Sequence, residues 1–274
     1  MLLKALGAKY LSRYKSYSAP WIVNMEQANG QQITIRIDEL TVETNKEITG
    51  KGKDQMGPFE ITGKVNNQGF AEFEKKYTSG SNKPVTQFHG NFTNCYMSGN
   101  WVVKGQCTGK FDMKMEGAKP YALQSDNTKE LIYLAFLEHN SRIHSVGILK
   151  SPSSPDKKFF ILNGKIYSEG SGHKELVMKF CYPQHKEEDY YMGEMKTKDN
   201  LIVIEGTAET HLPGGLFGSK TQSSRKFTLL ALPDMPTPPN ASANFPGAMM
   251  DIPQGPMLFP PRPSGPSGDD IATQ

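Results

Sequence analysis

The sequence predicts an all-β protein: two tandem antiparallel meander β-barrel modules, with a short N-terminal helix before them and a disordered proline-rich tail after them. Two observations predict this class. Apolar and polar residues alternate with a period of two from Gln31 onwards, and one order of strand and turn motifs occurs twice. The predicted segments are 1–30 (helix and lead-in), 31–120 (first module), 121–232 (second module) and 233–274 (tail).

The N-terminal segment begins MLLKALGAKYLSRYKSYSAP. The spacing of Leu3, Leu6, Tyr10 and Tyr14 keeps them on one face of a helix, which predicts a short amphipathic helix over Leu3–Tyr14. The segment is also basic and contains no acidic residue before Glu26, a composition that resembles a mitochondrial transit peptide. We expect a cytoplasmic protein, with a mitochondrial location as the alternative.

Half-buried strands are predicted wherever every second residue is apolar. Such alternation occurs at Ile33–Ile37, at Phe59–Val65 and at Ala71–Tyr77. Turn-forming residues separate these runs, as in Asn66–Gly69 and Ser79–Asn82. Strands follow one another every ~8 to 15 residues, too closely for crossover helices, so the sheet is expected to be a meander.

An internal duplication is indicated by five motifs that recur in the same order. Glycines within the strands of both copies suit a sheet that bends sharply and closes into a barrel. The matched motifs are Phe59–Val65 with Phe160–Ile166, the strand ending at Tyr77 with that ending at Tyr182, Phe88–Gly90 with Tyr191–Gly193, Gly99 with Gly206, and Lys110-Phe111 with Lys226-Phe227.

Over residues 31–232 this arrangement resembles the calycin-type barrels, the architecture shared by lipocalins and avidins. The resemblance is one of architecture and implies a closed up-and-down barrel whose interior is filled by side chains or holds one small ligand. The lipocalin Gly-x-Trp motif near the first strand is absent, since Trp21 stands in Ala19-Pro20-Trp21-Ile22. A lipocalin ligand cavity is therefore not implied.

Composition excludes several classes of function. The 31 basic and 28 acidic residues give a net charge of only +3, which does not indicate a nucleic-acid-binding surface. The most apolar segment, Leu131–Leu137, has the length of a strand and not the ~20 residues of a membrane helix. Cys95, Cys107 and Cys181 form no CxxC pair and are too few for a disulfide framework, which favours an intracellular protein.

The glycine-rich stretch Gly50–Gly57 (GKGKDQMG) has the composition of a phosphate-binding loop. Such a loop needs a following helix, because the helix N-terminus supplies the N–H groups that hold the anion. Strand-like residues, Pro58–Gly63, follow instead. We therefore expect a bulge and a tight turn between two strands, with Asp54 capping the turn.

No catalytic, metal or cofactor site is predicted. His89, Cys95 and Cys107 match no zinc-ligand spacing, and the five other histidines are scattered without a nucleophile or Asp at a recognisable spacing. No Gly-x-Ser-x-Gly elbow occurs, and Gly170-Ser171-Gly172 is typical of a hairpin turn.

Two groups of residues remain candidates for binding. Trp101 and Tyr77 are candidates for lining a ligand cavity, although aromatic residues in a small barrel more often form its core. The tail carries eleven of the nineteen prolines and includes Leu258–Pro263, which resembles the proline-rich ligands of EVH1 domains. Its candidate partner contacts are Phe259, Pro260, Pro261 and Pro263.

The sequence therefore predicts a non-catalytic structural or adaptor subunit of a larger intracellular protein assembly, without a cofactor. Its expected partners are other proteins of that assembly, with no nucleic acid and no membrane span. One alternative is a lipocalin-like carrier of a small molecule or lipid in one of the barrels. The other is an enzyme whose site the sequence does not reveal.

Overall fold

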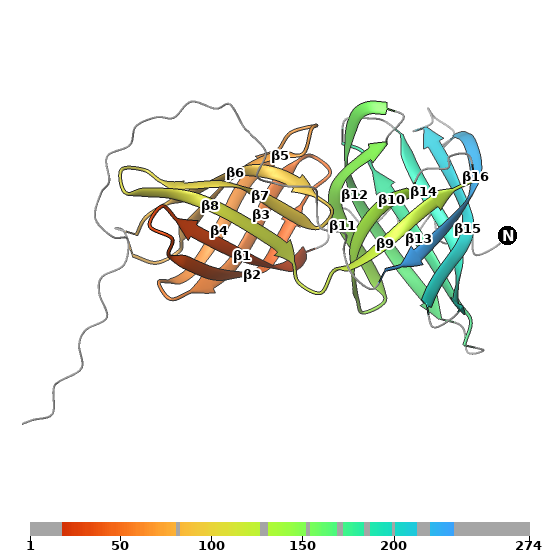
Figure 1. Cartoon of the computed structure of the whole chain (residues 1–274), viewed down its shortest axis with the longest axis horizontal. Helices are drawn as coiled ribbons and strands as arrows, with labels where there is room; N and C mark the ends of the chain where they lie inside the picture. Colours follow the sequence, from red (N-terminus) through yellow and green to blue (C-terminus); the bar gives the residue numbers. More distant parts are fainter. Residues whose placement is uncertain are drawn as a thin grey trace, which may run out of the picture.

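The computed structural model describes residues 18–80, 83–126, 131–151, 154–168, 172–183, 187–198, 201–212 and 220–232. These residues form two closed antiparallel β-barrels of eight strands each, one after the other along the chain (Figure 1). The predicted all-β fold with two tandem meander barrels is therefore confirmed. None of the described residues belongs to a helix with the length and apolar character needed to cross a membrane.

The first barrel follows the chain from β1 to β8, and β8 closes on β1. Its strands are β1 (Ser18–Gln27), β2 (Gln32–Val42), β3 (Glu47–Asp54), β4 (Gly57–Val65), β5 (Phe70–Tyr77), β6 (Thr86–Thr93), β7 (Tyr96–Val103) and β8 (Cys107–Met115). Successive side chains of a strand point to opposite faces of the sheet, so every second residue faces the barrel interior. Along β6, for example, buried and partly exposed residues strictly alternate.

The second barrel has the same topology, and β9 closes it by pairing with both β10 and β16. Its strands are β9 (Lys119–Ser125), β10 (Leu131–His139), β11 (Arg142–Ser151), β12 (Ser154–Ser168), β13 (Lys174–Cys181), β14 (Glu188–Lys198), β15 (Leu201–Leu212) and β16 (Lys220–Ala231).

The strand register bears out the repeat predicted from the five motifs. Each motif of the first barrel lies on the same strand, counted from the start of its barrel, as its counterpart in the second. Gly90 pairs with Gly99 between β6 and β7, and Gly193 pairs with Gly206 between β14 and β15. The duplicated sequence thus corresponds to a duplicated strand register and not only to similar turns.

The first barrel begins earlier than the sequence predicted. β1 lies within the segment 1–30 that was expected to be helix and lead-in, and its buried residues Trp21, Val23 and Met25 alternate with partly exposed ones. Apolar Ile22 stands at an outer position, which blurs the period-two pattern. The predicted helix over Leu3–Tyr14 and the tail 233–274 lie outside the described residues.

The glycine-rich stretch Gly50–Gly57 continues β3 and turns directly into β4, as expected. The N–H of Met56 donates to Oδ1 of Asp54 at 2.8 Å, so Asp54 caps the turn. The predicted bulge is not found in this stretch, because its pairing with β4 is unbroken. The nearest register shift lies on the neighbouring strand β2, between Ile37 and Glu39.

The two barrels share a packed joint. The end of the first barrel that carries the β4–β5 and β6–β7 turns meets the outer face of β10, β11 and β12 (Figure 1). Phe92 of the first barrel packs against Phe159 of β12, with ring centroids 6.0 Å apart. The turn residue Cys95 donates its N–H to the carbonyl oxygen of Val146 at 2.9 Å.

Strands at this joint are buried on both faces. Phe159 and Ile161 of β12 belong to the core that includes the first barrel, whereas the intervening Phe160 and the following Leu162 belong to the core of the second barrel. Such double burial requires apolar residues at successive positions, which explains the sequence Phe-Phe-Ile-Leu at 159–162.

Candidate functional site

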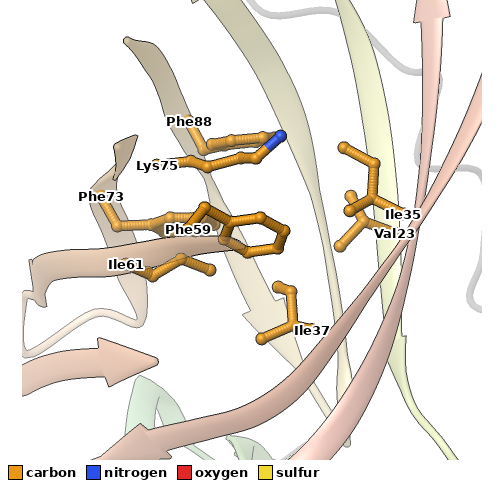
Figure 2. Close-up of a pocket in the computed structure, with 8 residues that line it drawn as sticks. All are labelled: Val23, Ile35, Ile37, Phe59, Ile61, Phe73, Lys75 and Phe88. Carbon is orange, nitrogen blue, oxygen red and sulfur yellow. The ribbon is translucent and has the colours of Figure 1, made fainter. Parts of the chain in front are cut away.

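A small cavity lies inside the first barrel (Figure 2). Its volume of about 10 Å³ is close to the space of a single water molecule. The lining comes from β1, β2, β4, β5 and β6 and consists of Val23, Ile35, Ile37, Phe59, Ile61, Phe73, Lys75 and Phe88. Seven of these side chains are apolar, so the one charged member stands out.

Lys75 projects into this apolar interior because it follows Phe73 by two residues on β5, and residues two apart share one face of a strand. Its Nζ forms an ion pair with Asp54 and donates to the Tyr77 hydroxyl at 2.8 Å. It also lies 4.6 Å from the ring centroids of Phe59 and Tyr77. The buried charge is thus held by one carboxylate, one hydroxyl and two aromatic faces.

Asp54 is the centre of this group. Its Oδ2 accepts the Tyr77 hydroxyl at 2.8 Å as well as Lys75, while its Oδ1 accepts the Met56 N–H. Burial by itself would raise the pKa of Asp54, but the hydrogen bonds from Lys75 and Tyr77 outweigh it and hold the pKa below its ordinary value. The carboxylate is therefore ionised at neutral pH.

Burial shifts the pKa values of the other two members of the group in opposite directions. Burial lowers the pKa of Lys75, and the partner Asp54 opposes this shift, so we assign an ammonium paired with a carboxylate. Burial and the neighbouring Asp54 raise the pKa of the Tyr77 phenol, which stays protonated and donates its hydrogen bond. The three groups neutralise and hydrogen-bond one another, an arrangement suited to stabilising the barrel.

A second lysine closes the same end of the barrel. Lys83, in the connection between β5 and β6, donates to the carbonyl oxygen of Met56 in the β3–β4 turn. Its Nζ also lies 5.1 Å from the ring centroid of Tyr77. Two connections that are distant in sequence are thereby tied together next to the Lys75 ion pair.

The sequence-predicted cavity residues Trp101 and Tyr77 lie in this barrel but do not line the cavity. Trp101 is only 1% exposed, and its Nε1–H donates to the carbonyl oxygens of Lys110 at 3.1 Å and Glu26 at 3.3 Å. Tyr77 lies behind the lining residue Lys75, from which its hydroxyl accepts a hydrogen bond. The tail candidates Phe259, Pro260, Pro261 and Pro263 lie outside the described residues.

Sequence reasoning missed the ion pair, although one signal was available. Lys75 interrupts the inward series Ala71, Phe73 and Tyr77, so alternation alone puts its charge inside the barrel. The identity of its partner carries no such signal, because Asp54 is 21 positions away and meets it only through the pairing of β3, β4 and β5.

The second barrel also contains a polar network near one end, built from different residues. Arg225 of β16 donates to Asp189 at 3.3 Å and to the Tyr191 hydroxyl at 2.9 Å. The Tyr182 hydroxyl donates to the same carboxylate at 2.8 Å. Tyr182 corresponds to Tyr77 in the repeat, so both barrels use a tyrosine at this position to hydrogen-bond an aspartate that is paired with a cation.

In the part of the chain that the structure describes, no three His, Cys, Asp or Glu side chains are grouped so as to hold a metal ion. Cys95, Cys107 and Cys181 are free thiols. Burial raises the pKa of Cys95 to about 11, so this thiol stays protonated.

Comparison with known proteins adds little to this geometry. No protein-family model and no curated protein sequence matches the chain. Among solved structures, an agglutinin from Burkholderia oklahomensis is similar over 79% of this chain and 96% of its own, with 9% sequence identity and a TM-score of 0.18. A TM-score this low supports no argument about the fold or function of this chain.

Proposed function

We propose that the protein is a non-catalytic structural or adaptor subunit of an intracellular protein assembly. The observation that carries this proposal is the packed joint between two barrels that have filled interiors. Aromatic rings stack inside both barrels: the ring centroids of Phe73 and Phe88 lie 4.9 Å apart in the first, and those of Tyr121 and Phe136 lie 3.9 Å apart in the second. Such a molecule holds two surfaces at a fixed distance, which is useful to a scaffold.

The carrier alternative requires an internal space that fits a ligand. Ligand pockets in proteins usually have volumes of roughly 300 to 1,000 Å³, whereas the cavity of the first barrel measures about 10 Å³. The eight-strand meander supports assigning each barrel to the calycin type, but filled interiors favour the scaffold over the carrier.

The enzyme alternative would have to draw on groups such as Lys75, Asp54 and Tyr77. Their polar atoms are engaged with one another inside the barrel, which favours a stabilising role. The outer surfaces and the two terminal segments then remain as the places where partners bind.

Affinity purification of the full chain from native extract, followed by mass spectrometry, tests the proposal. A stoichiometric set of partner proteins is expected, found in the cytoplasmic fraction, with the mitochondrial fraction as the alternative location. Native mass spectrometry of the same preparation would instead reveal a bound small molecule if the protein is a carrier. Recovery of the protein alone, without partner proteins, would overturn the proposed scaffold function.

The predicted tail contact is tested in the same experiment. Deleting residues 233–274, or changing Phe259 and Pro260 to alanine, should reduce partner recovery if a proline-binding domain takes this segment. Changing Ser264 and Ser267 to alanine is the matched control, since small polar residues contribute little to such contacts. Equal recovery by all variants would remove the tail from the binding surface.

A further inference from the structure

The second barrel has a seam between β10 and β11. These two strands pair at only three positions next to their turn, the last of them Leu137 with His144. The equivalent hairpin of the first barrel, β2–β3, pairs at five positions and continues past a register shift to Ile37 with Gly52. Residues 131–136 and 145–151, although the structure describes both stretches, therefore do not pair with each other.

The β6–β7 turn of the first barrel extends into this seam (Figure 1). Gly147 of β11 pairs with Phe160, a residue of the second barrel's core, so a Cβ on Gly147 would point into that barrel. This Cβ would lie 2.7 Å from Oδ1 and 3.0 Å from Cα of Asn94. The turn residue Asn94 therefore reaches past the outer face of β11 and lies between the two strands.

The next residue of the turn, Cys95, takes the hydrogen-bonding positions of the missing ladder. Ala135 and Val146 lie two residues beyond Leu137 and His144, so they would form the next equivalent pair if the ladder continued. Instead, the carbonyl oxygen of Val146 accepts the Cys95 N–H at 2.9 Å, and that of Ala135 accepts the Cys95 thiol at 3.0 Å. One residue of the first barrel thus binds both edges of the seam.

The backbone of Cys95 indicates that its side chain is needed at this place. Its φ of 52° lies in the left-handed region, where glycine is favoured because a side chain is crowded. Asn94 and Cys95 are also the two central residues of a hairpin turn between Thr93 and Tyr96, a turn type in which the second position is commonly glycine. The thiol's hydrogen bond to Ala135 offsets the unfavourable backbone conformation.

We propose that the β6–β7 turn is a removable wedge, and that β10 and β11 pair across Ala135 and Val146 when the first barrel withdraws from the joint. Both states satisfy the same two carbonyl oxygens, in one state by Cys95 and in the other by backbone N–H groups across the seam. The seam is then a two-state element that couples the position of the first barrel to the strand pairing of the second. Any partner that binds one state better shifts both features together.

Two substitutions should release the wedge in different ways. Gly147→Ala places a Cβ against Asn94, although this Cβ would also lie 3.1 Å from the Phe160 ring. Phe159→Ala removes the contact of the joint with Phe92 and leaves the interior of the second barrel unchanged. Phe160→Ala is the matched control, because it removes a ring of the same size from that interior.

Hydrogen–deuterium exchange of the full chain, read by mass spectrometry of its peptides, tests the proposal. In both release variants the amides of residues 91–96 should exchange roughly tenfold faster or more, because the turn leaves the seam. Those of residues 131–136 and 145–151 should exchange roughly tenfold more slowly, because they gain ladder partners. In Phe160→Ala, exchange at the seam should instead become faster together with the rest of the second barrel.

The direction of the change at the seam decides between a wedge and a support. Faster or unchanged exchange of residues 131–136 and 145–151 in the release variants would show that the turn does not hold these strands apart, and would overturn the proposal. An unchanged turn in a folded Gly147→Ala variant would also overturn it, because Asn94 could not then lie against position 147. If Gly147→Ala does not fold, the sign of the change in Phe159→Ala decides.

Discussion

The backbone N–H of Cys95 donates a 2.9 Å hydrogen bond to the carbonyl oxygen of Val146, joining the β6–β7 turn of one barrel to β11 of the other. The Cys95 thiol also donates to the carbonyl oxygen of Ala135 at 3.0 Å. Both residues of the backbone contact are buried, and apolar side chains surround them. This contact joins two barrels that each close through their own strands.

The joint predicts different effects for two adjacent phenylalanines. Phe159→Ala removes a ring that packs on the first barrel, whereas Phe160→Ala removes a ring from inside the second barrel. Each substitution should lower the free energy of unfolding by roughly 3 to 5 kcal/mol. Phe159→Ala should loosen the joint and expose the connection Glu116–Ala118 to protease while both barrels remain protected. Phe160→Ala should instead destabilise the second barrel itself. Identical cleavage patterns for the two variants would contradict the assignment of Phe159 to the joint and of Phe160 to the second barrel.

The buried ion pair predicts energetic coupling between Lys75 and Asp54. Lys75→Met leaves the carboxylate without its cation and should cost roughly 3 to 5 kcal/mol in the free energy of unfolding. Adding Asp54→Asn should restore part of that loss, because the unpaired charge is removed. Urea unfolding of the two single variants and the double variant measures the coupling. Strict additivity would show that the pair does not act as a unit.

His144 predicts a loss of stability in mild acid. Its Nδ1 lies 3.1 Å from Oδ1 of Asn163, and burial lowers its pKa to about 4, below the ordinary 6.5. Between these two values the unfolded chain binds a proton that the folded protein does not. Stability should therefore fall by up to ~3 kcal/mol as the pH drops from 6.5 to 4, at ~1.4 kcal/mol for each pH unit.

Urea unfolding across this pH range measures the effect of His144. His144→Gln should flatten the dependence of the unfolding free energy on pH, whatever its effect on stability at pH 7. Ile143→Val, a mildly destabilising change at the adjacent buried position, should keep the full slope. An unchanged slope in His144→Gln would assign the acid sensitivity to other groups.

Trp101 is predicted to stabilise the first barrel and not to bind a ligand. Trp101→Ala should cost roughly 3 to 5 kcal/mol, since it removes a buried ring and leaves two carbonyl oxygens without their indole donor. Trp101→Phe keeps a ring without the donor and should cost less. A variant that folds with unchanged stability but loses a copurifying small molecule would assign Trp101 to a binding site instead.

Much of the fold could be predicted because it depends on local patterns. Alternation of apolar and polar residues decides which face of each strand lies inside, and the recurrent glycines mark where the strands bend. β1 escaped this reasoning because Ile22 occupies an outer position, so its inward residues Trp21 and Val23 do not stand out. The candidate site was predicted less well, because the partners of Lys75 and Trp101 lie on strands distant in the sequence.

By itself, then, the sequence determined two meander barrels with matched registers, since period-two alternation and paired glycines act within a strand and its neighbours. The unbroken apolar run Leu131–Leu137 indicated only a segment of the length of a strand. Tertiary structure decided what covers its outer face, because Ala135 and Leu137 meet a hairpin end whose shape depends on the folding of the whole first barrel. Contacts between Cys95 and Val146, 51 residues apart, form only when both closed barrels exist to present them.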